Sequence, residues 1–119
     1  MKTKIAILLI CSFLSSCVLA EDKGQIYTLF SQANEAFRTA NTMTNTPQEA
    51  EKLYEKAILY YEKIINEYKI KNAKLYYNLA NAYLMQNNLT NSTSGIYLGK
   101  AILNYRKAEK LDNSYTNIK

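Results

Sequence analysis

The chain has 119 residues, of which 15 are basic, 10 are acidic and none is histidine. This length suits at most one domain, and the missing imidazole removes the commonest general base and metal ligand. The basic residues are interspersed with acidic ones and do not form the cluster that a nucleic-acid site requires. Composition therefore argues against an enzyme and against a nucleic-acid partner.

Motifs for catalysis, cofactor binding or metal binding are also missing. The sequence has no glycine-rich phosphate loop, no cysteine and histidine spacing for a metal, and no serine in a nucleophile-elbow context. Its acidic residues lie next to lysines, as on solvated helix faces, where such pairs contribute a few tenths of a kcal/mol. We therefore expect a non-enzymatic protein without a cofactor.

Residues 1–20 have the layout of a secretory signal sequence. Lys2 and Lys4 precede an apolar run over residues 5–14, and small residues follow it. The run is too short to cross a bilayer, which requires about 20 apolar residues. We therefore expect the protein to be exported to the periplasm or envelope.

Two cleavage sites stay open. Residues 14–17 resemble the bacterial lipobox, in which Cys17 becomes the lipidated first residue and the signal covers residues 1–16. Residues 18–20 form a small-x-small site for ordinary signal peptidase, with Glu21 as the new N-terminus. The first product would be anchored to the membrane by its lipid, and the second would be soluble. Neither product retains a cysteine pair, so the core must hold the fold without a disulfide.

The domain proper is expected over residues 24–119, and its first helix over residues 25–40. Apolar residues recur there at intervals of three and four, which is the pattern of an amphipathic helix. A polar turn follows. Thr46, Pro47 and Glu49 then indicate a helix start, with a threonine cap, a proline in the first helical position and a glutamate that closes a capping box.

The remaining helices are predicted from the same signals. The second helix extends to about Tyr68, and Asn72 is a plausible cap for a third helix that ends near Asn87 and Asn88. A polar loop follows, and Gly95 and Gly99 open a last helix that ends near residue 113. All predicted elements are helices, so the fold class is all-α.

The third and fourth helices resemble a tetratricopeptide repeat (TPR), whose pattern is W-x2-L-G-x2-Y, then A-x3-F, then P. The matching residues are Tyr76, Leu79, Ala80, Tyr83, Ala101, Tyr105, Ala108 and Asn113. A degenerate copy comes earlier, with Phe30, Ala33, Asn34 and Phe37 at the positions of Tyr76, Leu79, Ala80 and Tyr83. The resemblance implies two antiparallel helical hairpins, a short α-solenoid. Repeat one covers about 25–69, repeat two covers about 72–113, and an incomplete further helix covers 114–119.

The family binds an extended peptide or a partner's helix on the concave surface made by the first helix of each repeat. Carried over residue by residue, its groove positions are Thr28, Ser31, Glu35 and Arg38 in repeat one, and Lys74, Tyr77, Asn78, Asn81 and Leu84 in repeat two. Three of these, Lys74, Asn78 and Asn81, are similar to the clamp by which some members grip a C-terminal carboxylate. A carboxylate clamp, a generic groove of amide and aromatic groups, and a plain solvated polar face all stay open.

Two repeats are fewer than the three or so that usually make an array self-sufficient. The last helix is expected to leave an apolar side uncovered, formed by Ile102, Leu103, Tyr105 and Leu111. Exposed apolar area of this kind normally marks an interface. We therefore expect a protein partner, self-association through the last helix, or a continuation of the chain.

Within the repeat family, residues 33–119 resemble the TPR proteins of the bacterial aerotolerance (Bat) operon. The resemblance is carried by NAKLYYNLANAYL and GKAILNYRKAEKLDNSYTNIK. It implies an envelope scaffold that works beside membrane proteins with von Willebrand-type domains. Two other functions stay open: an assembly lipoprotein of outer-membrane or pilus machinery, and a soluble periplasmic peptide-binding module.

Overall fold

The computed structural model describes the backbone of residues 2–112 and the side chains of residues 22–112. Within this part of the chain there are four helices and no strand, which confirms the all-α class. The helices are α1 (Lys2–Thr42), α2 (Pro47–Asn66), α3 (Ala73–Thr90) and α4 (Ile96–Leu111). The predicted signal sequence and Cys17 lie outside the residues whose side chains are described, and the further helix predicted over 114–119 lies outside the described backbone.

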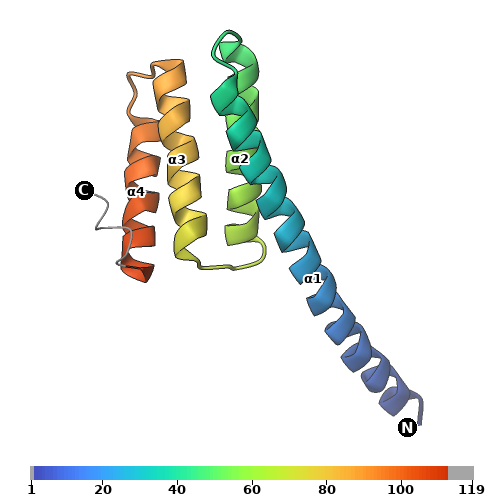
Figure 1. Cartoon of the computed structure of the whole chain (residues 1–119). Helices are drawn as coiled ribbons and strands as arrows, with labels where there is room; N and C mark the ends of the chain where they lie inside the picture. Colours follow the sequence, from blue (N-terminus) through green and yellow to red (C-terminus); the bar gives the residue numbers. More distant parts are fainter. Residues whose placement is uncertain (1, 113–119) are drawn as a thin grey trace.

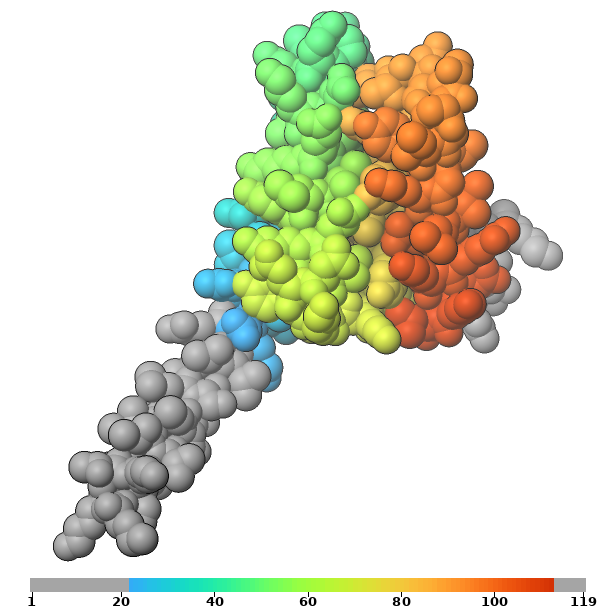
Figure 2. Space-filling view, turned by 180° about the vertical axis from the view of Figure 1, so that it is seen from behind, coloured from blue at the N-terminus to red at the C-terminus, as the bar shows by residue number. Residues whose placement is uncertain are grey.

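The helices pack in chain order, with α1 against α2, α2 against α3 and α3 against α4. Each helix runs antiparallel to the one before it (Figure 1). Seen from behind, α2 and α4 form the nearer layer and α3 lies recessed between them (Figure 2). The first and third helices therefore share one layer, and the second and fourth share the other.

Two predicted helix starts are confirmed, although one uses a different cap. Asn72 caps α3, because its side-chain oxygen accepts a hydrogen bond of 3.1 Å from the backbone N–H of Leu75. At α2, Pro47 takes the first helical position as predicted, but Thr46 makes no side-chain cap hydrogen bond. The predicted capping box is wrong because the Thr46 carbonyl, not its hydroxyl, accepts from the backbone N–H of Glu49 at 3.1 Å.

Two helix boundaries differ from the prediction. Helix α1 begins at Lys2 and not at Gln25. Helix α3 continues past Asn88 to Thr90, and Asn91 then ends it in the left-handed region with φ of 50°. These two extra residues include Leu89, which packs against a small cluster of buried residues from α1 and α2.

The core combines fully buried alanines with large side chains. Ala33, Ala57, Ala80, Ala82 and Ala108 have no exposed surface, so neighbouring helices approach closely at these positions. The larger members of the core include the buried residues Tyr61, Ile64, Leu75, Leu79 and Tyr83. Helix packing therefore depends on alternating small and large residues.

The last helix does leave apolar side chains exposed. Ile102, Leu103 and Leu111 are 43, 52 and 50% exposed, as the sequence predicts. The prediction was wrong for Tyr105, which is half-buried because its hydroxyl and ring both contact α3.

Candidate functional site

A hydrogen bond and an aromatic contact recur in the two halves of the fold. In the first half, the Tyr61 hydroxyl of α2 donates to the side-chain oxygen of Asn34 in α1. The Tyr61 ring also lies edge-on to Phe30, with centroids 6.1 Å apart. In the second half, the Tyr105 hydroxyl of α4 donates to Asn81 in α3, and its ring lies edge-on to Tyr77 at 5.6 Å.

These contacts correct the predicted internal alignment. Asn34 corresponds to Asn81, 47 residues later, and not to Ala80. Ala33 corresponds to Ala80, and both are fully buried. The predicted frame was one residue out, which on a helix is a rotation of about 100°. Tyr61 and Tyr105 are 44 residues apart, so the two halves differ in length between their helices.

A polar hollow of about 250 Å³ lies between α1 and α3. Its lining residues, which define what we call the amide hollow, are Asn34, Phe37, Arg38, Tyr61, Lys74, Asn78 and Asn81. The side-chain nitrogen of Asn78 donates to the oxygen of Asn34 at 3.3 Å, so this oxygen accepts from α2 and from α3. The bond joins α1 to α3 at the floor of the hollow.

The amide hollow is electropositive. Arg38 and Lys74 supply two cations, and no acidic residue lines it. Burial raises the pKa of Tyr61 to about 12, although the Asn78 side chain and the Arg38 charge both favour the phenolate. The phenol therefore stays protonated at neutral pH and acts as a donor to Asn34. Cationic and amide donors without an acid suit a carboxylate.

The structure brings together four of the predicted groove residues, namely Arg38, Lys74, Asn78 and Asn81. Tyr77 and Leu84 lie on the same helix but serve packing: Tyr77 contacts the Tyr105 ring, and Leu84 packs partly buried against the main core. Whether any of these six residues contacts a partner stays a prediction.

The other predicted positions on α1 do not line the amide hollow. Glu35 lines a separate hollow with Leu53 and Lys56 of α2, and Ser31 is exposed. Thr28 lies in a third hollow, described below. The frame error accounts for Glu35, which was taken as the counterpart of Asn81 in place of Asn34, because neighbouring residues lie on different sides of a helix.

Sequence reasoning missed Asn34 as a member of this site. The predicted alignment puts Asn34 at the packing position of Ala80, because Asn34 lies three residues before Phe37 and Ala80 lies three residues before Tyr83. The signal that could have identified it is the pair Ala33-Asn34, which repeats as Ala80-Asn81. The same pair also occurs as Ala40-Asn41, where Asn41 accepts a hydrogen bond from Tyr54 and Phe37 contacts the Tyr54 ring, so the pair alone narrows the register without fixing it.

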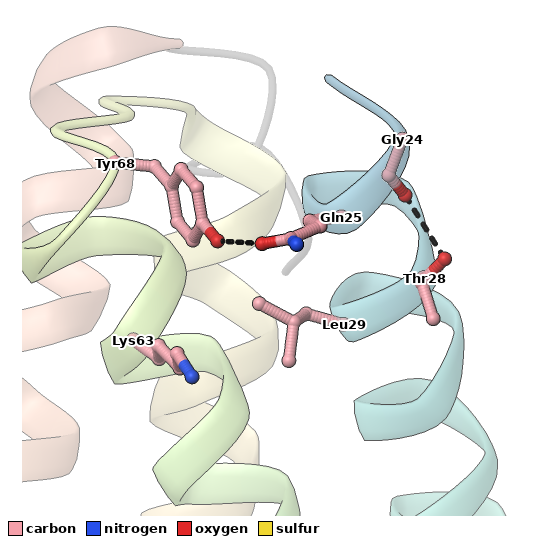
Figure 3. Close-up of a pocket in the computed structure, with 6 residues that line it drawn as sticks. All are labelled: Gly24, Gln25, Thr28, Leu29, Lys63 and Tyr68. Carbon is pink, nitrogen blue, oxygen red and sulfur yellow. Dashed lines mark hydrogen bonds between the residues drawn. The ribbon is translucent and has the colours of Figure 1, made fainter. Parts of the chain in front are cut away.

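A larger hollow, of about 550 Å³, lies between the described start of the α1 side chains and the end of α2 (Figure 3). Two pairs of its polar groups are bonded to one another. Tyr68 donates to the Gln25 side chain at 2.5 Å, and Thr28 donates to the Gly24 carbonyl at 2.9 Å. With Lys63 as its only charged lining residue, this hollow offers less recognition chemistry than the amide hollow.

Two further findings concern the described residues of the chain. No group of three or more His, Cys, Asp or Glu side chains there could hold a metal ion. No helix in that part is long and apolar enough to cross a membrane.

Comparisons with protein-family models, with curated proteins and with solved structures each found no match.

Proposed function

We propose that the protein is a non-enzymatic interaction module built from two TPR-like hairpins. The support is the repeated contact set, in which an aromatic and a carboxamide of one helix receive the tyrosine of the next. Tyr61 meets Phe30 and Asn34, as Tyr105 meets Tyr77 and Asn81. In this arrangement α1 and α3 are the first helices of their repeats.

The binding surface is the amide hollow, and its ligand is a peptide or helix of a partner protein that carries a carboxylate. The single observation that carries this proposal is the lining of the hollow, which holds Arg38, Lys74 and three asparagines but no acid. A carboxylate there would receive charge-assisted hydrogen bonds, which are about twice as strong as neutral ones. The predicted groove of amide and aromatic groups would therefore prefer a negatively charged ligand.

Peptide binding tests this function. Fluorescent peptides that carry a single glutamate, with glutamine at that position as the matched control, would be titrated against the mature protein. We expect the glutamate peptide to bind more tightly and the difference to shrink with added salt, since salt screens exposed charges.

Variants of the protein assign the effect to the hollow. Lys74→Ala should reduce the preference for glutamate, whereas Lys71→Ala, at an exposed lysine outside the hollow, should leave it unchanged. Equal binding of both peptides, or equal effects of both variants, would contradict the proposal.

The proposed location is the bacterial envelope, supported by the signal-like residues 1–20. Within it, an aerotolerance-type membrane complex is the first setting to examine, because of the resemblance in residues 33–119. An assembly lipoprotein and a soluble periplasmic module are the alternatives. Mass spectrometry of the mature N-terminus separates them: a lipidated Cys17 supports an anchored protein, and Glu21 as first residue supports a soluble one.

A further inference from the structure

Contacts of one kind between a tyrosine and an asparagine occur three times in the fold. In each of them, a tyrosine hydroxyl of α2 or α4 donates to the asparagine side chain of the helix before it. The tyrosine ring also lies edge-on to an aromatic ring four residues before that asparagine. The three pairs are Tyr61 with Asn34, Tyr54 with Asn41, and Tyr105 with Asn81.

A fourth asparagine takes the next place in this series but has no tyrosine. The two pairs between α1 and α2 are related by a step of seven residues along each helix. From Asn81 the same step leads to Asn88 of α3. From Tyr105 it leads to Leu98 of α4, whose side chain has no hydrogen-bond donor. Asn88 is exposed, and its side chain forms no hydrogen bond with another described residue.

Asn88 lines a hollow of about 260 Å³ at the end of the fold where α1 and α3 end and α2 begins (Figure 1). No charged residue lines this hollow, so an uncharged side chain suits it. We call it the methionine hollow, and its lining includes Asn41, Met43, Tyr54, Met85, Asn88 and Leu89.

The lining suits an aromatic ring that carries a hydroxyl. Thioether sulfurs make favourable contacts with aromatic rings, and Met43 and Met85 each supply one. The Asn41 oxygen accepts from Tyr54 at 2.6 Å, which leaves the amide N–H groups of Asn41 to donate. A phenol in the hollow would therefore donate to the Asn88 oxygen and accept from Asn41, whereas an aliphatic side chain would pair with neither.

The methionine hollow continues the amide hollow along α3. Lys74, Asn78 and Asn81 in one hollow, and Met85 and Asn88 in the other, follow at intervals of three and four residues and share one face of the helix. From Asn78 to Met85 and Asn88 the helix rises by about 11–15 Å. Four residues of an extended peptide span about 13 Å, and side chains four positions apart point to the same side.

We propose that the methionine hollow binds a tyrosine side chain of the partner peptide whose carboxylate occupies the amide hollow. The two side chains are four positions apart in an extended segment. The inference rests on the proposed function for the place of the carboxylate. It adds a second recognition element, in which Asn88 takes the phenol that its place in the series lacks.

Fluorescent peptides with one glutamate and, four positions away, one tyrosine test this inference. The tyrosine precedes the glutamate in one peptide and follows it in the other, because a groove of this kind binds a chain in one direction. The matched controls carry phenylalanine or alanine in place of the tyrosine, and a further control carries glutamine in place of the glutamate. Binding to the mature protein would be measured by fluorescence anisotropy.

In one of the two orders, we expect the tyrosine peptide to bind about fivefold more tightly than the phenylalanine peptide, the effect of one net hydrogen bond. The phenylalanine peptide should bind about tenfold more tightly than the alanine peptide, because its ring is buried. Asn88→Leu should remove the first preference and keep the second. Asn66→Leu, at an exposed asparagine of α2 outside both hollows, should leave both unchanged.

Equal binding of the tyrosine and phenylalanine peptides in both orders would overturn the inference, and so would a tyrosine preference that survives Asn88→Leu. If glutamate is still preferred over glutamine in these cases, the proposed function stands and only the role of the methionine hollow is wrong. Loss of the glutamate preference, or no binding of any peptide, would overturn both.

Self-association gives a separate check on the occupant. A dimer of the protein alone in sedimentation equilibrium that Asn88→Leu dissociates would overturn the inference, because a second copy would then occupy the methionine hollow. Circular dichroism of each variant separates lost binding from lost folding.

Discussion

The carboxamide side chain of Asn34 connects three helices in this fold. The oxygen of Asn34 accepts from Tyr61 of α2 and from Asn78 of α3. Because the Tyr61 residue is only 1% exposed, water has little access to its hydroxyl. Asn34 therefore has a structural role in addition to its place in the amide hollow.

Replacing Asn34 should destabilise the protein because the Tyr61 hydroxyl then loses its hydrogen-bond acceptor. Asn34→Ala leaves the buried Tyr61 hydroxyl without its acceptor, and a buried group left unpaired costs about 1–3 kcal/mol. Urea denaturation should show this loss in the free energy of unfolding. In the double variant Asn34→Ala/Tyr61→Phe the two losses should not add, because the unpaired hydroxyl is then absent. Additive losses would show that the two side chains do not interact.

Tyr61 should also make stability depend on alkaline pH. Its pKa in the folded protein is raised to about 12 by burial, above the ordinary value of about 10. The unfolded chain therefore loses this proton first. Its contribution to stability is fully present below pH 10 and is lost as pH rises toward 12.

Thermal unfolding between pH 9 and 12 would measure this effect. We expect the melting temperature of Tyr61→Phe to fall less steeply above pH 10 than that of the unmodified protein. Tyr54 and Tyr105, whose pKa values are also raised by burial, contribute to the slope that remains. Parallel curves for the two proteins would contradict the assignment to Tyr61.

At the scale of elements, the two glycines of the last hairpin have opposite roles. Gly95 precedes α4 with φ of 71°, a conformation that side chains disfavour. Gly99 lies inside α4, and an added Cβ there would meet no atom within 4 Å. One glycine therefore serves the turn, and the other weakens the helix.

Alanine substitutions should separate the two roles. Gly99→Ala should stabilise the protein by about 0.5–1 kcal/mol, because alanine is the better helix former. Gly95→Ala should destabilise it by about 1–2 kcal/mol, the cost of the left-handed conformation. Chemical denaturation of the two variants in parallel gives the comparison. Destabilisation by Gly99→Ala would contradict the open space around this residue.

Elements were predictable from sequence where their signals are local. Pro47 and Asn72 act within one turn of the chain, so both helix starts could be predicted. The end of α3 could not, because Leu89 is held by the cluster that includes Ala40 and Tyr54. A tertiary contact there outweighs the helix-ending tendency of Asn87 and Asn88.

At the scale of the whole molecule, the helices form a linear array in which each packs on the next along the chain (Figure 1). Such arrays gain stability from interfaces between neighbours. The inner helices α2 and α3 are covered from two sides, whereas the main packing of α4 is on α3. The outer side of α4 is therefore the end of the array within the described residues.

The sequence by itself determined the all-α class, the four helices and the exposed apolar side of the last one. Those features depend on periodicity and on capping residues, which act over one or two turns. Only the tertiary structure decided that Asn34 pairs with Tyr61 and corresponds to Asn81, and that Arg38 and Lys74 meet in one hollow. Such contacts depend on the rotation of each helix about its axis, which packing between helices sets.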